Sequence, residues 1–193
     1  MEIAALVDAG TKTSSGDWDV ILSVVSAGAG HFMISPNCVR WAVVSYADTA
    51  TQSITLTAHS SLTTLQPAIR ALPLINGGSN LLSALQLLRS QVFTNSIIRT
   101  RATLVAWFVT DDLACSSQLV AEANNLKTLG VVIVGVVFTS RNTVDVNCVR
   151  EIVTANMYYE VSDSFQASDA AIQAEEAARG VCPPNYWSKS SAT

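Results

Sequence analysis

Residues 5–14 read ALVDAGTKTS, an apolar run followed by an acidic residue and a loop of small polar residues. Asp8, at the end of this run, is placed where a phosphatase has its nucleophile, where an actin-like ATPase has its phosphate loop, or where a binding module holds a cation. Lys12 brings a positive charge into the same loop, four residues after Asp8. These ten residues alone leave the chemistry open.

A mostly parallel sheet is the scaffold that the hydrophobic pattern predicts for this loop. Strand-like and helical patterns alternate in the order βαββααβαβαβα. The polar stretch 47–51 is too short for a crossover, so the second and third strands should be antiparallel. We therefore expect an α/β fold, a doubly wound and mostly parallel sheet with one antiparallel edge strand and helices on both faces. The predicted strands are 3–7, 39–46, 53–57, 103–109, 131–138 and 158–161, and the predicted helices are 17–34, 62–72, 79–92, 118–129, 144–154 and 167–178.

Length and composition exclude several classes of protein. The chain has 193 residues, which suits one domain and is too short for the two-lobed sugar kinases and actin-like ATPases. Hydrophobic residues make up 49% and charged residues 13%, so we expect a folded chain. The net charge is -4 and the basic residues are scattered, which leaves no patch for nucleic acid.

Hydropathy gives no sign of a membrane segment. The longest apolar stretch, 131–138, has the length of a strand, so no membrane insertion is expected. The run after Met1 carries Glu2 and lacks a basic start, so we expect no signal peptide in this chain.

Three polar loops should meet at the carboxyl edge of the sheet: 8–12, 77–80 and 110–112. Their arrangement resembles that of the von Willebrand factor type A domain. The segment CVRWAVVSYAD (38–48) resembles that family's second strand, and GGSNLLSAL (77–85) resembles the start of its glycine-threonine helix. The segment GVCP (180–183) resembles the sequence with which the family's domain ends. The resemblance implies one domain over 1–182 and a tail, 183–193, that leads towards flanking domains of a longer chain.

Family members of the integrin type carry a metal-ion-dependent adhesion site, whose first loop is Asp-x-Ser-x-Ser. The resemblance implies a weak or vestigial site for Mg²⁺ or Mn²⁺ at Asp8, Ser79 and Asp111. Gly10 and Lys12 stand at the two Ser positions, where one has no side-chain oxygen and the other is a cation. Our hypothesis is that Lys12 folds back between Asp8 and Asp111 in place of the metal; the alternative is that it points to solvent.

The resemblance also implies a function in binding. We expect an extracellular or secreted adhesion module that binds a protein or matrix ligand through the loop end built from residues 8–12, 77–80 and 111–115. Gly10, Lys12, Asn80 and Asp112 are the candidate contact residues. The alternatives are an adhesion domain that binds by a side face without metal, with these loops vestigial, a structural module that self-assembles in a matrix, or a metal-dependent phosphatase-like or ATPase-like enzyme. An enzyme is not expected, because a phosphatase needs a second acidic residue two after its nucleophile, where Gly10 stands.

The four cysteines lie far apart, without a CxxC pair, and only two His accompany them, so a zinc site is not expected. Cys115 and Cys148 follow neighbouring predicted strands, and Cys38 and Cys182 belong to the opposite end of the fold. The expected disulfides are therefore Cys115–Cys148 and Cys38–Cys182, in an oxidising compartment. Four free thiols are the alternative.

Overall fold

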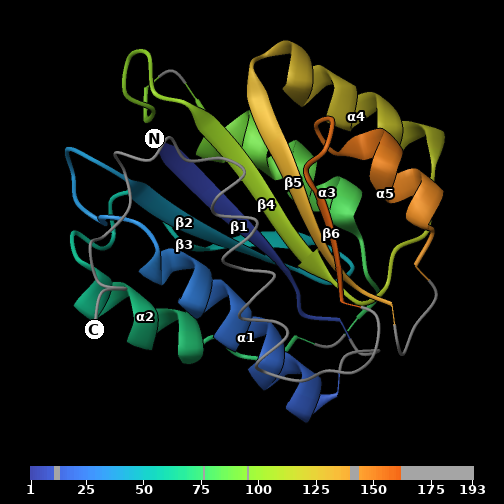
Figure 1. Ribbon diagram of the computed structural model, residues 1–193, viewed down its shortest axis with the longest axis horizontal. Coiled ribbons are helices and arrows are strands. Elements are labelled where there is room, and N and C mark those ends of the chain that lie inside the picture. Colours follow the sequence, from blue (N-terminus) through green and yellow to red (C-terminus); the bar gives the residue numbers. More distant parts are fainter. Residues whose placement is uncertain (11–13, 76, 95, 140–143, 162–193) are drawn as a thin grey trace.

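A six-stranded sheet forms the centre of the protein in the computed structural model, which describes residues 1–10, 14–75, 77–94, 96–139 and 144–161 (Figure 1). Its strand order is β3-β2-β1-β4-β5-β6. Strand β3 is antiparallel to β2, and the other neighbours are parallel, so the predicted fold class is confirmed. The strands are β1 (Glu2–Asp8), β2 (Arg40–Tyr46), β3 (Ala50–Ile54), β4 (Leu104–Thr110), β5 (Val131–Phe138) and β6 (Tyr158–Val161).

Helices cover both faces of the sheet (Figure 1). Strand β1 has apolar side chains on both faces of the sheet, so both faces need a cover. Ile3, Ala5 and Val7 belong to one apolar core, whereas Ala4 and Leu6 belong to another. Because both faces are covered, the central strands are continuous apolar runs. One core packs under α1 (Ser15–Gly30) and α2 (Leu62–Arg70); the other packs under α3 (Leu81–Leu87), the π-helical turn η1 (Leu88–Val92), α4 (Ser117–Thr128) and α5 (Val146–Ile152).

The predicted end of the first helix was wrong. Helix α1 ends at Gly30, not at residue 34, because the N–H groups of His31 and Phe32 turn back to the carbonyls of Gly28 and Ala29. Phe32 and Ile34 are buried, which explains the extended apolar pattern. Burial there comes from the turn that follows the helix.

The predicted third strand was shifted by three residues. Strand β3 starts at Ala50, which pairs with Tyr46, so the connection is the tight turn 47–49 and not the stretch 47–51. The N–H of Ala47 donates to the carbonyl of Thr49 across this turn. A register shift between Val43 and Val44 marks a bulge, which the alternation of residue types did not reveal.

The predicted helix 167–178, the domain end at Cys182 and the tail 183–193 lie outside the described residues. None of the helices within the described ranges combines the length and the apolar character that a membrane crossing requires.

The amino edge of the sheet is held by an ion-pair cluster around Glu2, which is fully buried. Arg40 donates to both carboxylate oxygens of Glu2 at 2.7 Å, and Nε of Arg99 donates to Oε1 at 2.7 Å. Arg99 also donates to the carbonyls of Met1 and Cys38. Burial raises the pKa of Glu2, but the bonds from the two guanidinium groups outweigh it and hold this pKa below its ordinary value. The cluster ties the chain start to two distant loops.

Candidate functional site

Asp8, Ser79, Asp111 and Asp112, four of the predicted site residues, lie at the opposite, carboxyl edge of the sheet. Asp8 is the last residue of β1 and Thr110 the last of β4, and these parallel neighbours bring the two side chains together. Ser79 comes from the loop before α3. Asp8 is only 1% exposed and Thr110 is fully buried, so the contacts between them are largely shielded from water.

The hydroxyl groups of Ser79 and Thr110 connect Asp8 to the third loop. Both donate to Oδ2 of Asp8, Thr110 at 2.9 Å, and both also lie within hydrogen-bond distance of the carbonyl oxygen of Asp112, at 2.9 Å for Ser79 and 2.8 Å for Thr110. The N–H of Gly10 donates to Oδ1 of Asp8 at 3.1 Å. Each hydroxyl carries one proton between two acceptors, so these protons are shared by Asp8 and the backbone of Asp112.

Burial dominates the electrostatics of this carboxyl group. It raises the pKa of Asp8 to about 6, although the hydrogen bonds from Ser79, Thr110 and Gly10 act in the opposite direction. The nearby charge of Asp111 acts in the same direction as burial and is included in this value. A buried carboxylate of this kind favours the binding of a positive charge, because a cation would offset the cost of desolvation.

Residues of all three loops thus lie together, but the predicted residues interact with Asp8 in different ways. Asp8, Ser79 and Asp112 are in direct contact, and the contact to Asp112 runs through its backbone carbonyl. Asp111 is fully buried and acts on Asp8 through its charge. The Asn80 side chain makes two contacts away from Asp8: its Oδ1 accepts from the N–H of Ser83 at the start of α3, and its Nδ2 donates to the carbonyl of Asp48. Lys12 lies outside the described residues, so the hypothesis that its side chain takes the place of the metal stays a prediction.

Thr110 is the site residue that the sequence reasoning missed. The loop 110–112 was expected at this edge, but no role was assigned to its first residue. Thr110 follows six apolar residues of β4 and ends the strand, where a polar side chain must find a partner. A polar residue at the end of an apolar strand was therefore the feature of the sequence that could have indicated its contact with Asp8.

Gly10 and the second loop decide how well the family's metal site fits this chain. A Cβ built on Gly10 would lie 2.6 Å from the carbonyl oxygen of Gly78, closer than real Cβ contacts allow. A serine at position 10 therefore has no space unless the backbone moves. Within the described residues, no group of three or more His, Cys, Asp or Glu is placed to hold a metal ion. The residues present do not supply the family's complete ligand set.

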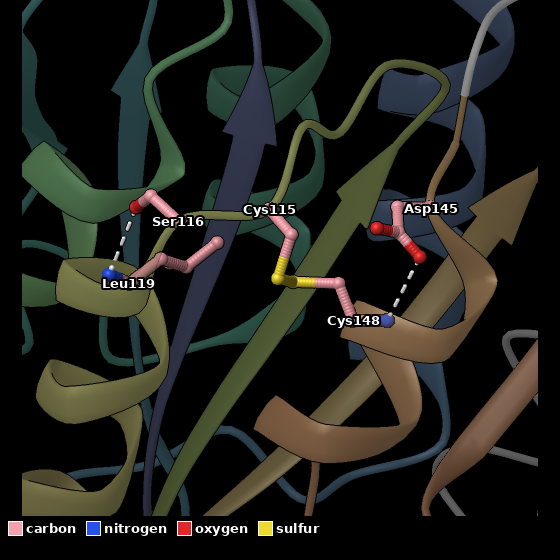
Figure 2. Close-up of a disulfide and its surroundings, with 5 residues drawn as sticks. All are labelled: Cys115, Ser116, Leu119, Asp145 and Cys148. Atoms are coloured by element: carbon pink, nitrogen blue, oxygen red, sulfur yellow. Dashed lines mark hydrogen bonds between the residues drawn. A yellow bond between two sulfur atoms is a disulfide. The ribbon is translucent and has the colours of Figure 1, made fainter.

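A disulfide lies beside the third loop (Figure 2). Cys115, in the β4–α4 loop, is bonded to Cys148 of α5, with 5.5 Å between the Cα atoms, as the sequence predicted. It joins the starts of two helices, whose caps are Ser116 and Asp145. The partner predicted for Cys38, Cys182, lies outside the described residues.

A cavity of about 90 Å³ opens next to the Asp8 contacts. Ser79 and Asp112 line it on the side of the site, and Ala114 and Ser116 belong to the loop that carries the disulfide. Leucines make up most of the remaining lining: Leu81, Leu82, Leu113 and Leu119. The edge therefore offers polar and apolar contacts side by side.

Similar architectures occur among solved structures. Proximal thread matrix protein 1 (PTMP1) from the mussel byssus matches with a TM-score of 0.80 and 19% sequence identity, over 94% of this chain and 46% of that chain. The same protein with a zinc occupied MIDAS motif matches with a TM-score of 0.81 and 21% identity, over 94% and 45%. The chain thus spans less than half of the mussel protein.

A second protein shows the same fold. The manganese-loaded TRAP protein of Plasmodium vivax matches with a TM-score of 0.71 and 14% identity, over 89% of this chain and 71% of that chain. The comparison with curated protein sequences gives no match. The family model of the von Willebrand factor type A domain matches residues 2–173. Because this match covers most of the sequence, the chain belongs to the von Willebrand factor type A family.

Proposed function

We propose that this domain is an adhesion or matrix-binding module that recognises a protein partner through the loops at the carboxyl edge of the sheet. The observation that carries the proposal is the contact of three loops around buried Asp8, made by the hydroxyls of Ser79 and Thr110. The contact joins one residue of each loop, Asp8, Ser79 and Thr110, and the adjacent cavity gives a partner side chain a place to enter.

Binding, not catalysis, is what this arrangement supports. Both oxygens of Asp8 already accept hydrogen bonds, from Gly10 on one side and from Ser79 and Thr110 on the other. These bonds do not use every lone pair of the carboxylate, but a phosphatase nucleophile also needs a proton donor nearby, and the position two residues after Asp8 that carries it in such enzymes is a glycine here. Contact with a partner would rest on polar loop atoms and bound water, together with the leucine side chains that line part of the cavity.

Weak or absent metal dependence is part of the proposal. Gly10 offers no side-chain oxygen, and the Gly78 carbonyl occupies the space beside it. Lys12 would add a cation to the same loop and compete with a divalent ion for the carboxylates. Where such an ion does bind, Asp8, Ser79 and Asp111 are the residues proposed to hold it.

The proposed location is extracellular. The support is the disulfide Cys115–Cys148, since such bonds persist mainly in oxidising compartments. A protein or matrix ligand is the proposed partner, and no role with nucleic acid is proposed for an acidic chain of net charge -4.

A solid-phase binding assay on purified fibrillar collagen, fibronectin and laminin tests the proposed face. Ala114→Arg places a large side chain at the cavity without removing a hydrogen bond, and Ala121→Arg, on the exposed side of α4, is its matched control. We expect Ala114→Arg to lose binding and Ala121→Arg to keep it. Equal binding by both variants, or no binding to any matrix protein, would overturn the proposed face or the proposed function.

Calorimetric titration of Mg²⁺, Mn²⁺ and Ca²⁺ into the metal-stripped protein tests the metal dependence. We expect no saturable binding until Lys12 is replaced by serine, because the ammonium group then no longer competes. Saturable binding to the unchanged protein would instead support cation-dependent adhesion.

A further inference from the structure

The second loop of the site has few side chains of its own. Gly77 and Gly78 precede Ser79, so contacts from elsewhere must fix the direction of the Ser79 hydroxyl. Those contacts come from the turn between β2 and β3. Oδ1 of Asp48 accepts the N–H of Gly78 at 2.7 Å, and the backbone carbonyl of Asp48 accepts from the Asn80 side chain at 2.9 Å. Asp48 thus holds the residues on both sides of Ser79.

The two glycines pack closely against this carboxylate, so a side chain at either position would displace it. A Cβ on Gly77 would lie 2.7 Å from Oδ2 of Asp48, and one on Gly78 would lie 3.0 Å from Oδ1. Gly77 also has a φ of +140°, a backbone conformation that residues with a side chain rarely adopt. The absence of side chains therefore brings the loop into direct contact with Asp48.

The other side of the same loop packs on the first loop. The Gly78 carbonyl lies where a side chain of Gly10 would be, and the N–H of Ile75 donates to the carbonyl of Ala9 at 3.0 Å. Gly10 in turn donates to Oδ1 of Asp8. A continuous series of contacts thus runs from Asp48 through the glycine pair to Asp8, by way of Gly10 and Ser79.

We propose that Asp48 is a positioning residue for the carboxyl-edge site, which it acts on by holding the backbone of Gly77 and Gly78. Asp48 is exposed, so burial in the core does not explain its contacts. It touches neither Asp8 nor Asp112 in the contacts described above, and its influence passes through Ser79. That this site binds a partner rests on the proposed function, but the coupling itself is testable without any partner or metal.

Amide spectra of the isotope-labelled protein test the coupling. The Gly10 amide donates to Asp8, and the Leu113 amide follows the Asp112 carbonyl that accepts from Ser79, so both report on the site. We expect Asp48→Ala to shift both resonances and to speed amide exchange at Gly78 about tenfold, the effect of losing a hydrogen bond of about 1.5 kcal/mol.

Two further variants separate geometry from charge. Asp48→Asn keeps an acceptor at Oδ1 and should leave the Gly10 and Leu113 resonances near those of the unchanged protein. Asp48→Glu keeps the charge but displaces the carboxylate, and should shift them as Asp48→Ala does. Asp19→Ala, at an exposed position of α1, is the control and should leave both unchanged.

The proposal is overturned if Asp48→Ala and Asp48→Glu alter only residues 47–49 and 77–80. If Asp48→Ala does not fold, the comparison of Asp48→Glu with Asp48→Asn decides the question. A failure of matrix binding would count against the proposed function and leave this coupling standing, because no ligand enters the measurement.

Discussion

Strand β1 has a buried carboxyl group at each end, and the protein treats the two in opposite ways. Glu2, at the amino edge, accepts hydrogen bonds from the guanidinium groups of Arg40 and Arg99. Asp8, at the carboxyl edge, accepts from the Ser79 and Thr110 hydroxyls and a backbone N–H. The pKa of Glu2 is held below its ordinary value, whereas burial raises the pKa of Asp8 to about 6.

The difference separates a structural carboxylate from one that is suited to binding. Glu2 has cations of its own, so its charge is compensated within the fold. Among the described residues, the donors to Asp8 are neutral, and they only partly offset the cost of burying its charge. An added cation would therefore stabilise the carboxyl edge and gain nothing at the amino edge.

Removing the Glu2 charge should have the largest effect. Glu2→Gln leaves Arg40 and Arg99 without their counter-charge, and we expect a loss of about 3 to 5 kcal/mol in the free energy of unfolding. Urea denaturation at pH 7 measures it, with the exposed Glu151→Gln as control. The stabilisation that the charged Glu2 provides should also decrease as the pH falls from about 4.5, because a carboxyl group with a lowered pKa loses its stabilising effect when it is protonated. Equal midpoints for the two variants would contradict the structural role.

Neutralising Asp8 should act in the opposite direction. With a pKa of about 6 in the fold and 3.8 as the ordinary value, the folded state favours the protonated form, so stability is lost as the pH rises from about 4 to 6. At about 1.4 kcal/mol per pH unit, Asp8→Asn should gain about 3 kcal/mol of stability relative to the unchanged protein between pH 4 and pH 7.5. This gain adds to a cost that does not depend on pH, because the amide nitrogen of asparagine cannot accept the hydrogen bonds made to one of the two oxygens of Asp8.

Urea unfolding in the presence of EDTA, at several pH values, measures this difference. The exposed Asp19→Asn is the control for an aspartate-to-asparagine change away from the site. A constant gap between Asp8→Asn and the unchanged protein would show that the two ends of β1 do not differ as described.

Restoring the family serine at the first loop should destabilise the fold. Gly10→Ser brings a Cβ within 2.6 Å of the Gly78 carbonyl, and we expect a cost of about 1 to 3 kcal/mol and no gain in Mn²⁺ binding by calorimetry. Gly16→Ser is the matched control, since the nearest atom to its Cβ would be Oγ of Ser14 at 3.9 Å. Tighter Mn²⁺ binding by Gly10→Ser would show that the glycine alone limits the site.

The smallest effect is expected from removing one neutral donor. Ser79→Ala deletes a hydrogen bond that favours the charged form of Asp8, so the pKa of Asp8 should rise further and the free energy of unfolding at pH 7.5 should fall by about 1 kcal/mol. Carbon-13 spectra of the aspartate carboxyl groups follow the titration. The exposed Ser60→Ala should leave it unchanged. A lower pKa in Ser79→Ala would mean that the hydroxyl does not donate to Asp8.

Local patterns predicted most of the fold. The apolar runs of β1, β4 and β5 are strands buried on both faces, and the short connection after β2 made β3 antiparallel. The errors lay at the ends of elements. Phe32 and Ile34 extended the helical pattern although they are buried after the turn, because burial and helicity produce the same apolar pattern.

The sequence by itself determined the order of the elements and that three polar loops gather at one edge, because periodicity and connection length are local properties of the chain. Only the tertiary structure decided which groups meet there. Glu2 finds Arg40 and Arg99 at separations of 38 and 97 residues, and the hydroxyls of Ser79 and Thr110 converge on Asp8 from two distant loops. Such partners depend on how distant loops pack, which local residue patterns do not encode.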